Sequence, residues 1–369
     1  MLAQAYHRAA MADVPSDVGT IETREVMVTR KFESRDFGTP IDRNLALELV
    51  RVTEGAALAA ARFRGRNQKE EADHAAVESM RKSLSYIDMD GIVVIGEGEK
   101  DEAPMLYIGE HVGNGSPPEV DVAVDPIDGT RLVARGLPGG IATVALAERG
   151  SLYFTHVPYM EKLIVGPRAA DVIDITDSVE QNLSRIAEAE GRNVEDLTIV
   201  VLDRPRHEQL LEEIRTAGAM VKLIMDGDVA AGVMAAMEHR TGIDALWGIG
   251  GAPEAVLAAC AIKCVGGGMQ GRLWLREQDE ELLRKERKKP GEVLTLDDLC
   301  AGNNVFFAAT GITDGELLHG VRFFGGMART HSLVTRSYSG TVRYIEAEHT
   351  FEKLRRRGLP EPPQSAGLA

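Results

Sequence analysis

The chain has 369 residues, 44% apolar and only 5% aromatic, so we expect two packed units with largely aliphatic cores. Its formal net charge of -15 is the opposite of the basic balance typical of nucleic-acid binders, and no apolar run approaches the roughly 18 residues of a membrane span. Three cysteines (Cys260, Cys264 and Cys300) without a CxxC pair, and an N-terminus without a secretory signal, favour a reducing, cytoplasmic location.

The first half of the chain predicts helices followed by strands. Residues 1–40 mix charges with Gly and Pro without periodicity, so we expect a mobile extension. From Asp42, the expected N-cap of the first helix, apolar residues recur every three or four positions. The spacing predicts helices over 42–63 and 72–84 and strands at 92–95, 120–124, 141–147, 151–156 and 162–165. We expect Pro126 to end the second strand, and the strands around residues 148–150 to form a hairpin.

The second half alternates strand and helix. The predicted strands are 198–202, 221–225 and 245–247, and the predicted helices are 208–217, 229–237 and 253–262. This order implies a parallel or mostly parallel sheet covered by helices. Residues 276–290 are dense in charge and predict a solvated helix or insertion, and strands return near 305–309, 332–336 and 341–346. We therefore expect an α/β (α+β layered) sandwich, with an N-terminal mixed sheet flanked by helices and packed on a second, βαβ-rich half.

Acidic residues and glycines follow the predicted strands. The strings are GEGE (96–99), DPIDGT (125–130), DGD (226–228) and GIGGAPE (248–254), and DRPRH (203–207) adds two arginines. Ligands of such sheets gather beyond the carboxyl ends of the strands. Hard cations such as Mg²⁺ and Mn²⁺ take oxygen ligands, glycine permits close backbone approach, and paired arginines suit a second anionic group. The pattern therefore predicts a site for divalent cations and phosphate.

The segment 125–130 is the strongest of these signals. Its proline lets Asp125 project from the strand tip, and Asp128 can reach the same ions. Gly129 permits tight approach, and the Thr130 hydroxyl can orient a water. An ordinary turn with an Asx cap is the alternative, because Asp, Pro and Gly are turn residues. The other acidic strings, taken singly, are typical of solvated turns or helix ends, so the interpretation depends on their convergence.

These strings resemble a known family. The segments are IVVIGEGE (92–99), EAPMLY (102–107), DPIDGT (125–130), YMEK (159–162), RPRH (204–207), DGDVA (226–230) and GIGGAPE (248–254). They resemble class II (GlpX-type) fructose-1,6-bisphosphatases, of the lithium-sensitive, metal-dependent phosphatase superfamily, in the same order from about Arg43 to Glu346. The resemblance implies a metal/phosphatase domain at 41–195, a sugar-phosphate-binding α/β domain at 196–346 and a C-terminal tail at 347–369.

The resemblance also implies residue roles. Asp73 and Glu97 would bind one metal, and Asp125, Asp128 and Glu254 a second, joined by the Ile127 carbonyl. Asp128, Gly129 and Thr130 would contact the scissile phosphate, with Thr130 and Lys69 in catalytic roles. The sugar and its other phosphate would be held by Tyr159, Arg204, Pro205, Arg206, Asp226, Gly227, Asp228 and Gly251. The implied cofactor is Mn²⁺ or Mg²⁺, and the implied assembly is a homo-oligomer, a dimer or tetramer.

The function that follows is hydrolysis of the 1-phosphate of fructose 1,6-bisphosphate, in gluconeogenesis, by in-line attack of a metal-activated water. Three alternatives stay open. The substrate could be another phosphate ester, such as sedoheptulose 1,7-bisphosphate or an inositol or nucleotide phosphate. A haloacid-dehalogenase-type phosphatase would use residues 226–230, although its D-x-D-x-T string here ends in alanine. A regulatory metal- or nucleotide-binding module would use 248–251, although Pro253 replaces the last glycine of G-x-G-x-x-G.

Overall fold

The computed structural model describes residues 45–97 and 106–356, with side chains as far as residue 353. The expectations for 1–40, for Asp42, Glu99 and residues 102–105, and for 357–369 lie outside the described residues. The described residues all belong to one compact unit of the chain, which begins at Asp42. None of their helices combines the length and the apolar character that crossing a membrane requires.

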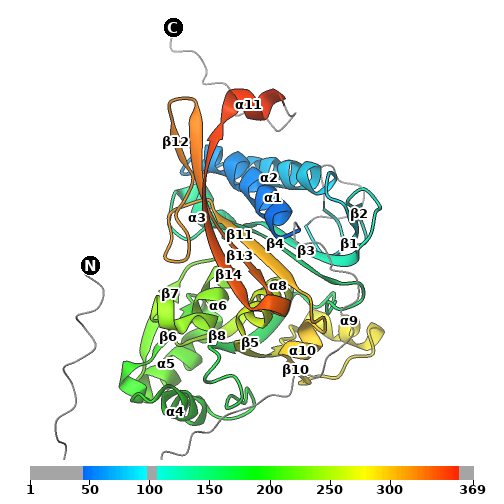
Figure 1. Cartoon of the computed structure of the whole chain (residues 1–369). Coiled ribbons are helices and arrows are strands. Elements are labelled where there is room, and N and C mark those ends of the chain that lie inside the picture. Colours follow the sequence, from blue (N-terminus) through cyan, green and yellow to red (C-terminus); the bar gives the residue numbers. More distant parts are fainter. Residues whose placement is uncertain (1–44, 98–105, 357–369) are drawn as a thin grey trace, which may run out of the picture. The chain divides into compact units, whose positions relative to one another are not determined.

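The first sheet of the described residues has 8 strands in the order β12-β13-β11-β4-β3-β1-β2, with β14 along β13 (Figure 1). Its strands are β1 (Asp90–Ile95), β2 (His111–Val112), β3 (Glu119–Asp128), β4 (Ile141–Glu148), β11 (Phe306–Gly311), β12 (Arg322–Phe324), β13 (Met327–Arg336) and β14 (Thr341–Thr350). β1 pairs with β3 in parallel, and the neighbouring pairs are antiparallel. The strands predicted near the C-terminus are confirmed and complete this sheet.

The second sheet of the described residues has 6 strands in the order β10-β9-β5-β8-β6-β7. Its strands are β5 (Tyr159–Val165), β6 (Thr198–Leu202), β7 (Met220–Ile224), β8 (Ala245–Gly251), β9 (Gly268–Leu273) and β10 (Val293–Thr295). β6 lies parallel to β7 and β8, but β5 is antiparallel to both β8 and β9. The predicted βαβ alternation and its parallel pairing are therefore confirmed for β6–β8, but the complete sheet is mixed, because β5, β9 and β10 pair antiparallel.

Helices cover the sheets in separate layers. The helices and helical turns are α1 (Leu45–Ala60), η1 (Ala61–Phe63), α2 (Lys69–Leu84), α3 (Thr130–Arg135), α4 (Val179–Glu190), η2 (Val194–Asp196), η3 (Pro205–His207), α5 (Glu208–Thr216), α6 (Asp228–Ala236), α7 (Glu238–Thr241), α8 (Ala252–Val265), η4 (Glu277–Asp279), α9 (Glu280–Lys285), α10 (Leu296–Leu299), η5 (Ser337–Ser339) and α11 (Phe351–Arg356). α1 and α2 pack on the first sheet, because their apolar stripe shares a core with its strands. α4 and α5 pack on the second sheet in the same way.

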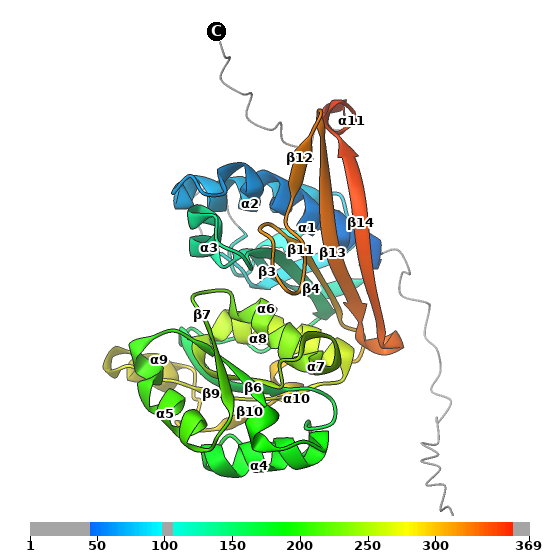
Figure 2. The same cartoon turned by 90° about the vertical axis from the view of Figure 1, so that its left-hand side faces the viewer.

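α6 and α8 form the middle layer, between the two sheets (Figure 2). Their core cluster joins Ala145 and Phe307 of the first sheet to Ile164 and Leu246 of the second. Residues 255–262 of α8 are all buried, which explains why this helix is apolar on every side rather than striped. The predicted layered α/β sandwich is confirmed, and its middle layer places the start of both helices at the facing strand ends.

Two local predictions are wrong. Pro126 does not end its strand: β3 continues to Asp128, and its pairing with β4 shifts register between Asp125 and Asp128. A bulge of this kind accommodates proline, which has no N–H to donate to the ladder. Residues 151–156 form no strand and no hairpin with β4; Leu152 makes only an isolated bridge with Cys300, because β11 occupies that edge of β4.

The domain division at residues 195/196 stays a prediction. The two sheets divide the chain differently from it, since β5 lies in the second sheet and β11–β14 return to the first. The charged stretch 276–290 contains the short helix α9, whose exposed pairs Glu280–Arg284 and Glu281–Lys285 fit the expected solvated helix.

Candidate active site

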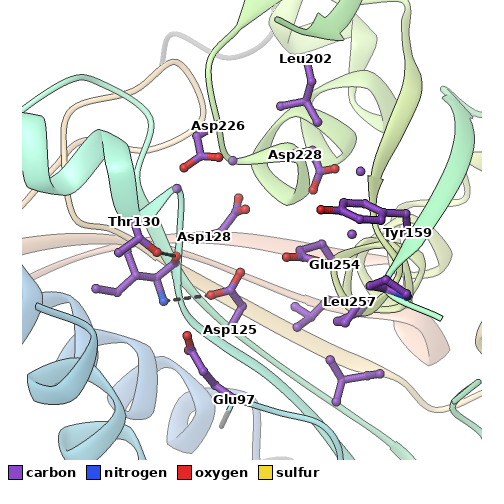
Figure 3. Close-up of a pocket in the computed structure, with 18 of the residues that line it drawn as sticks. Glu97, Asp125, Asp128, Thr130, Tyr159, Leu202, Asp226, Asp228, Glu254 and Leu257 are labelled. Carbon is purple, nitrogen blue, oxygen red and sulfur yellow. Dashed lines mark hydrogen bonds between the residues drawn. The ribbon is translucent and has the colours of Figure 1, made fainter. Parts of the chain in front are cut away.

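A cavity of about 520 Å³ opens where strand ends of both sheets meet the first turns of α3, α6 and α8. Figure 3 shows acidic side chains from both sides pointing into it. The lining residues with polar side chains are Glu97, Asp125, Asp128, Thr130, Tyr159, Arg204, Arg206, Asp226, Asp228 and Glu254. The convergence on which the sequence interpretation depends is thus present: acids that follow different strands share one cavity.

The bulge of β3 fixes the geometry of segment 125–130. The Asp125 carboxylate accepts the Ile127 N–H at 3.0 Å, and the Thr130 hydroxyl donates to the Ile127 carbonyl at 3.2 Å. Asp128 is buried, and its Oδ2 accepts the Ala230 N–H of α6 at 3.1 Å. Each carboxylate therefore has one oxygen held by the backbone, which leaves its other oxygen to face the cavity.

Two glycines at the end of β8 make room for the carboxylates of Asp228 and Glu254. A Cβ added to Gly251 would lie 1.7 Å from Glu254 Oε2, and one added to Gly250 would lie 1.8 Å from Asp228 Oδ2. Any larger residue would displace those carboxylates, because no rotation of a Cβ relieves such an overlap. Gly250 and Gly251 therefore serve close packing of acids against the backbone.

The acids of the first sheet raise one another's pKa. Burial, then the charges of Asp128 and Glu97, hold the pKa of Asp125 well above its usual value. Although Glu97 as a residue is exposed, desolvation of its carboxyl, followed by the charges of Asp73 and Glu254, raises its pKa to about 7. Burial is also the main cause that raises the pKa of Asp128 and of Glu254. Close carboxyl groups in a desolvated site favour a bound cation or retained protons.

Asp73 and Lys69 belong to the same neighbourhood, although neither side chain lines the cavity itself. Asp73 lies in α2, and burial raises its pKa to about 6 despite a hydrogen bond from Thr130 and the nearby charge of Lys69. Lys69, exposed at the start of α2, also lowers the pKa of Glu97. The structure therefore brings both residues to the first-sheet side of the cavity.

The opposite side combines arginines with paired acids. Arg206 donates two hydrogen bonds to the Ile249 carbonyl, at 2.7 and 3.2 Å, and its guanidinium lies 5.5 Å from the ring centre of Tyr159. Arg204 and Arg131 both contact Asp226 Oδ1 at 3.4 Å. Pro205 is not among the cavity-lining residues and instead begins the η3 turn that carries Arg206. This side therefore presents guanidinium groups already oriented by neighbouring acceptors.

The donor set fits a divalent cation. Glu254 Oε2 is buried without a hydrogen-bond partner in the described residues, and the acids around it are carboxylates of the kind that hard cations prefer. In the arrangement seen, no three Asp, Glu, His or Cys side chains of the described ranges are close enough to hold one ion. Ion binding therefore requires side-chain rotation, and the residues able to contribute are Glu97, Asp125, Asp128 and Glu254, with Asp73 beside them.

The sequence interpretation gave no role to Lys162 or Arg131. The Lys162 side chain is only 1% exposed and pairs with Asp228, and Arg131 pairs with Asp226. The sequence does contain a signal for Lys162. It begins the apolar strand Lys-Leu-Ile-Val, and a lysine buried in such a strand needs an acidic partner. Arg131 left none, since an arginine after a helix start is ordinary.

Acidic side chains and arginines line one cavity at the strand ends, an arrangement that suits a phosphoric monoester hydrolase, in which cations and arginines bind phosphate. Comparison with known proteins identifies the family of this hydrolase. The chain belongs to the family of bacterial fructose-1,6-bisphosphatases, glpX-encoded, whose model matches residues 43–349.

Two relatives of similar length agree with this family. The chain is 46% identical over 345 residues to the D-fructose 1,6-bisphosphatase class 2/sedoheptulose 1,7-bisphosphatase of Synechococcus sp. (strain JA-2-3B'a(2-13)), over 86% of this chain and 99% of that protein. It is 43% identical to the protein of the same name from Microcystis aeruginosa, over 85% and 98%. The structure of extragenic suppressor protein suhB from Bartonella henselae is similar at a TM-score of 0.30 and 14% identity, over 53% of this chain and 74% of that one.

Proposed function

We propose that this protein hydrolyses the 1-phosphate of fructose 1,6-bisphosphate to give fructose 6-phosphate and phosphate. The observation that carries the proposal is the cavity itself. Figure 3 shows Asp125 and Asp128 on one side and Tyr159 on the other, and Arg204 and Arg206 line the same cavity. A sugar with a phosphate at each end matches this arrangement. One phosphate would bind through cations held by the acids, and the other through the paired N–H donors of the arginines. We place the reaction in the cytoplasm and in gluconeogenesis.

The acids and Thr130 are proposed to serve the scissile phosphate. Bound Mn²⁺ or Mg²⁺ would neutralise phosphate charge and lower the pKa of an attacking water, and the ligands would be Asp73, Glu97, Asp125, Asp128 and Glu254. The Thr130 hydroxyl lies near both the Ile127 carbonyl and Asp73. In the proposed reaction its single proton would turn to the Asp73 carboxylate, so that its oxygen can accept from the attacking water and orient it. Lys69 adds positive charge on the same side, and Gly129 lets the phosphate approach the backbone.

The second-sheet side is proposed to hold the rest of the substrate. Arg204 and Arg206 would bind the 6-phosphate, with Pro205 fixing the turn between them and Tyr159 packing on the sugar. Asp226, Gly227, Asp228 and Gly251 would contact the sugar hydroxyl groups. Because the proposed nucleophile is a water that attacks the scissile phosphate directly, no enzyme-bound phosphoryl intermediate is expected.

Sedoheptulose 1,7-bisphosphate is the second candidate substrate, because the relatives are named for both sedoheptulose 1,7-bisphosphatase and fructose 1,6-bisphosphatase activity. Sedoheptulose 1,7-bisphosphate carries phosphates at both ends, as the proposed site requires, and is one carbon longer. We also propose a homo-oligomer, a dimer or tetramer, as the assembly.

The test is a phosphate-release assay on the metal-free protein with fructose 1,6-bisphosphate, with and without Mn²⁺ or Mg²⁺, followed by addition of lithium. We expect release only with a divalent cation, and inhibition by lithium. Sedoheptulose 1,7-bisphosphate, an inositol phosphate and a nucleotide phosphate run alongside rank the substrates. No metal-stimulated release from any of them would overturn the proposal, and faster release from an inositol phosphate would replace the substrate.

A further inference from the structure

Lys162 is among the largest fully buried side chains of the described residues, and it carries an ammonium group. It lies in β5 and is 1% exposed, with buried Met160, Leu163 and Ile164 close by in the strand. Burying a charge costs several kcal/mol unless the charge is paired and hydrogen-bonded. A buried lysine beneath a functional cavity therefore needs a reason beyond packing.

The contacts of Lys162 lead directly to the cavity. Its Nζ forms an ion pair with Asp228 Oδ2 at 2.7 Å and donates to the Gly251 carbonyl at 3.2 Å. Asp228 is the first residue of α6 and Gly251 the last of β8, and both line the cavity, whereas Lys162 does not. Lys162 thus acts on the cavity only through its neighbours.

Asp228 stands among the proposed metal ligands without being one of them. After burial, its charge is the next cause that raises the pKa of Asp128 and of Glu254, which shows how close the three carboxyl groups are. Figure 3 shows Asp228 and Glu254 side by side on one side of the cavity, with Asp128 facing them. A free carboxylate at this place would be a natural additional ligand for a cation.

We propose that Lys162 is a positioning residue that reserves Asp228 for the sugar by holding the oxygen that would otherwise turn to the metal. The inference rests on the proposed function and extends it, because it explains how a single cavity keeps cation ligands and sugar ligands apart. The Lys162 ammonium lies 2.7 Å from Oδ2 of Asp228, a buried oxygen that has no hydrogen-bond partner in the described residues, so charge attraction holds this oxygen and Oδ1 is left to accept from a hydroxyl of the substrate.

The proposal predicts opposite effects on the two ligands when Lys162 is replaced by methionine, which has a similar length and no charge. Released Asp228 joins the cation ligands, so Mn²⁺ binds the metal-free protein about five- to tenfold more tightly. The same release removes the sugar contact, so KM for fructose 1,6-bisphosphate rises by about tenfold or more. If Lys162 served only to stabilise packing, the replacement would weaken the binding of both Mn²⁺ and fructose 1,6-bisphosphate, because a disordered site loses affinity for every ligand.

The experiment titrates metal-free protein with Mn²⁺ by calorimetry and measures KM at saturating Mn²⁺ for each variant. The set comprises Lys162→Met, Lys162→Arg, Asp228→Asn and the double variant Lys162→Met/Asp228→Asn. We expect the double variant to lose the gain in Mn²⁺ affinity, because the amide is a poor cation ligand. Lys162→Arg keeps the positive charge, so its KM should rise less than that of Lys162→Met. The exposed Lys285→Met, whose residue pairs with Glu281 at 2.9 Å, is the matched control and should change neither quantity.

Weaker or unchanged Mn²⁺ binding in folded Lys162→Met overturns the proposal, as does a double variant that keeps the gain. Should Lys162→Met fail to fold, Gly250→Ala supplies the test, since its Cβ would lie 1.8 Å from Asp228 Oδ2 and would displace that carboxylate. Unchanged Mn²⁺ affinity in Gly250→Ala would then contradict the inference. The calorimetric cycle uses no substrate, so its result stands apart from any failure of the proposed substrate.

Discussion

The two sides of the cavity hold acids in different states. On the first-sheet side, Glu97 and Asp125 crowd other carboxyl groups, and burial and mutual repulsion raise the pKa of both. On the second-sheet side, Asp226 contacts Arg131 and Arg204, and Asp228 contacts Lys162. Glu254 lies beside Asp228, but burial and the charge of Asp228 raise its pKa, so it belongs with the first set. The first set therefore lacks positive charge, whereas each acid of the second set contacts a lysine or an arginine.

This difference assigns ligands to the two sides. Acids that repel one another in a desolvated site gain most from an added cation, so the first side suits metal and scissile phosphate. Acids neutralised by a lysine or arginine attract a further cation weakly but still accept hydrogen bonds, so the second side suits sugar hydroxyl groups. The following changes test that division, beginning with the largest expected effect.

Asp125→Asn removes a carboxylate from the crowded side. We expect phosphate release to fall by about 10³-fold or more, the scale of losing a strong transition-state interaction in a dry site. The metal-free variant should unfold at a higher temperature than the parent, because a buried like charge is gone. Steady-state assays and thermal unfolding with and without Mn²⁺ measure both, and the exposed Asp171→Asn is the control. Near-full activity in Asp125→Asn would show that the cation ligands lie elsewhere.

Arg206→Ala removes a donor from the paired side. A charged hydrogen bond to phosphate contributes about 1.5–3 kcal/mol, so KM for fructose 1,6-bisphosphate should rise about 10- to 100-fold while kcat changes little. A simple phosphate ester without a second phosphate should be hydrolysed as before. If that ester loses the same factor as the bisphosphate, Arg206 serves the scissile phosphate and the assignment of the two sides is reversed.

The pH dependence of stability provides a third test. The pKa of Glu97 is raised to about 7 and that of Asp73 to about 6, above their values of 4.5 and 3.8 in the unfolded chain. Between those values the folded protein holds more protons, so these groups make the metal-free protein less stable as pH rises from about 4 to about 7. Mn²⁺ must displace the same protons, so its affinity should increase over that range.

The measurement compares unfolding temperature against pH for the parent and Glu97→Gln, each with chelator and with Mn²⁺. The parent should lose several degrees relative to Glu97→Gln as pH rises in chelator, and the difference should shrink with Mn²⁺. Parallel curves in chelator would mean that Glu97 is already neutralised by a partner.

The smallest effect is expected at the exposed ion pair of Glu281 and Lys285 in α9. Glu281→Gln breaks the exposed pair with Lys285, and exposed pairs of this kind contribute little to stability because water and salt screen them. We expect a change of at most a degree or so in unfolding temperature and unchanged kinetics. A kinetic effect would show that the charged stretch 276–290 takes part in the reaction.

Much of this organisation is readable in the sequence, because it is local. The string at 125–130 places two acids, a glycine and a threonine within six positions, and apolar spacing gives α1, α5, α8 and most strands. Local order also indicates which acids follow strands, since a strand end and its turn are neighbours in the chain.

The parts that sequence did not predict depend on distant residues. β4 pairs with β11, some 160 positions later, so residues 151–156 are left without the strand role that their neighbourhood suggests. Asp228, at the start of α6, pairs with a lysine of β5, which no spacing reveals. Pro126 stays in its strand because a bulge opposite β4 absorbs it, and that bulge is a property of the pair of strands.

Anomalous diffraction at the manganese edge, from crystals grown with Mn²⁺ and a fructose 1,6-bisphosphate analogue, tests the central claim most directly. The account predicts a Mn²⁺ peak within about 2.5 Å of carboxylate oxygens of Asp125 and Glu254, with Asp228 still against Lys162. A peak bound only by Asp226 and Asp228, or no peak in this cavity, would contradict it.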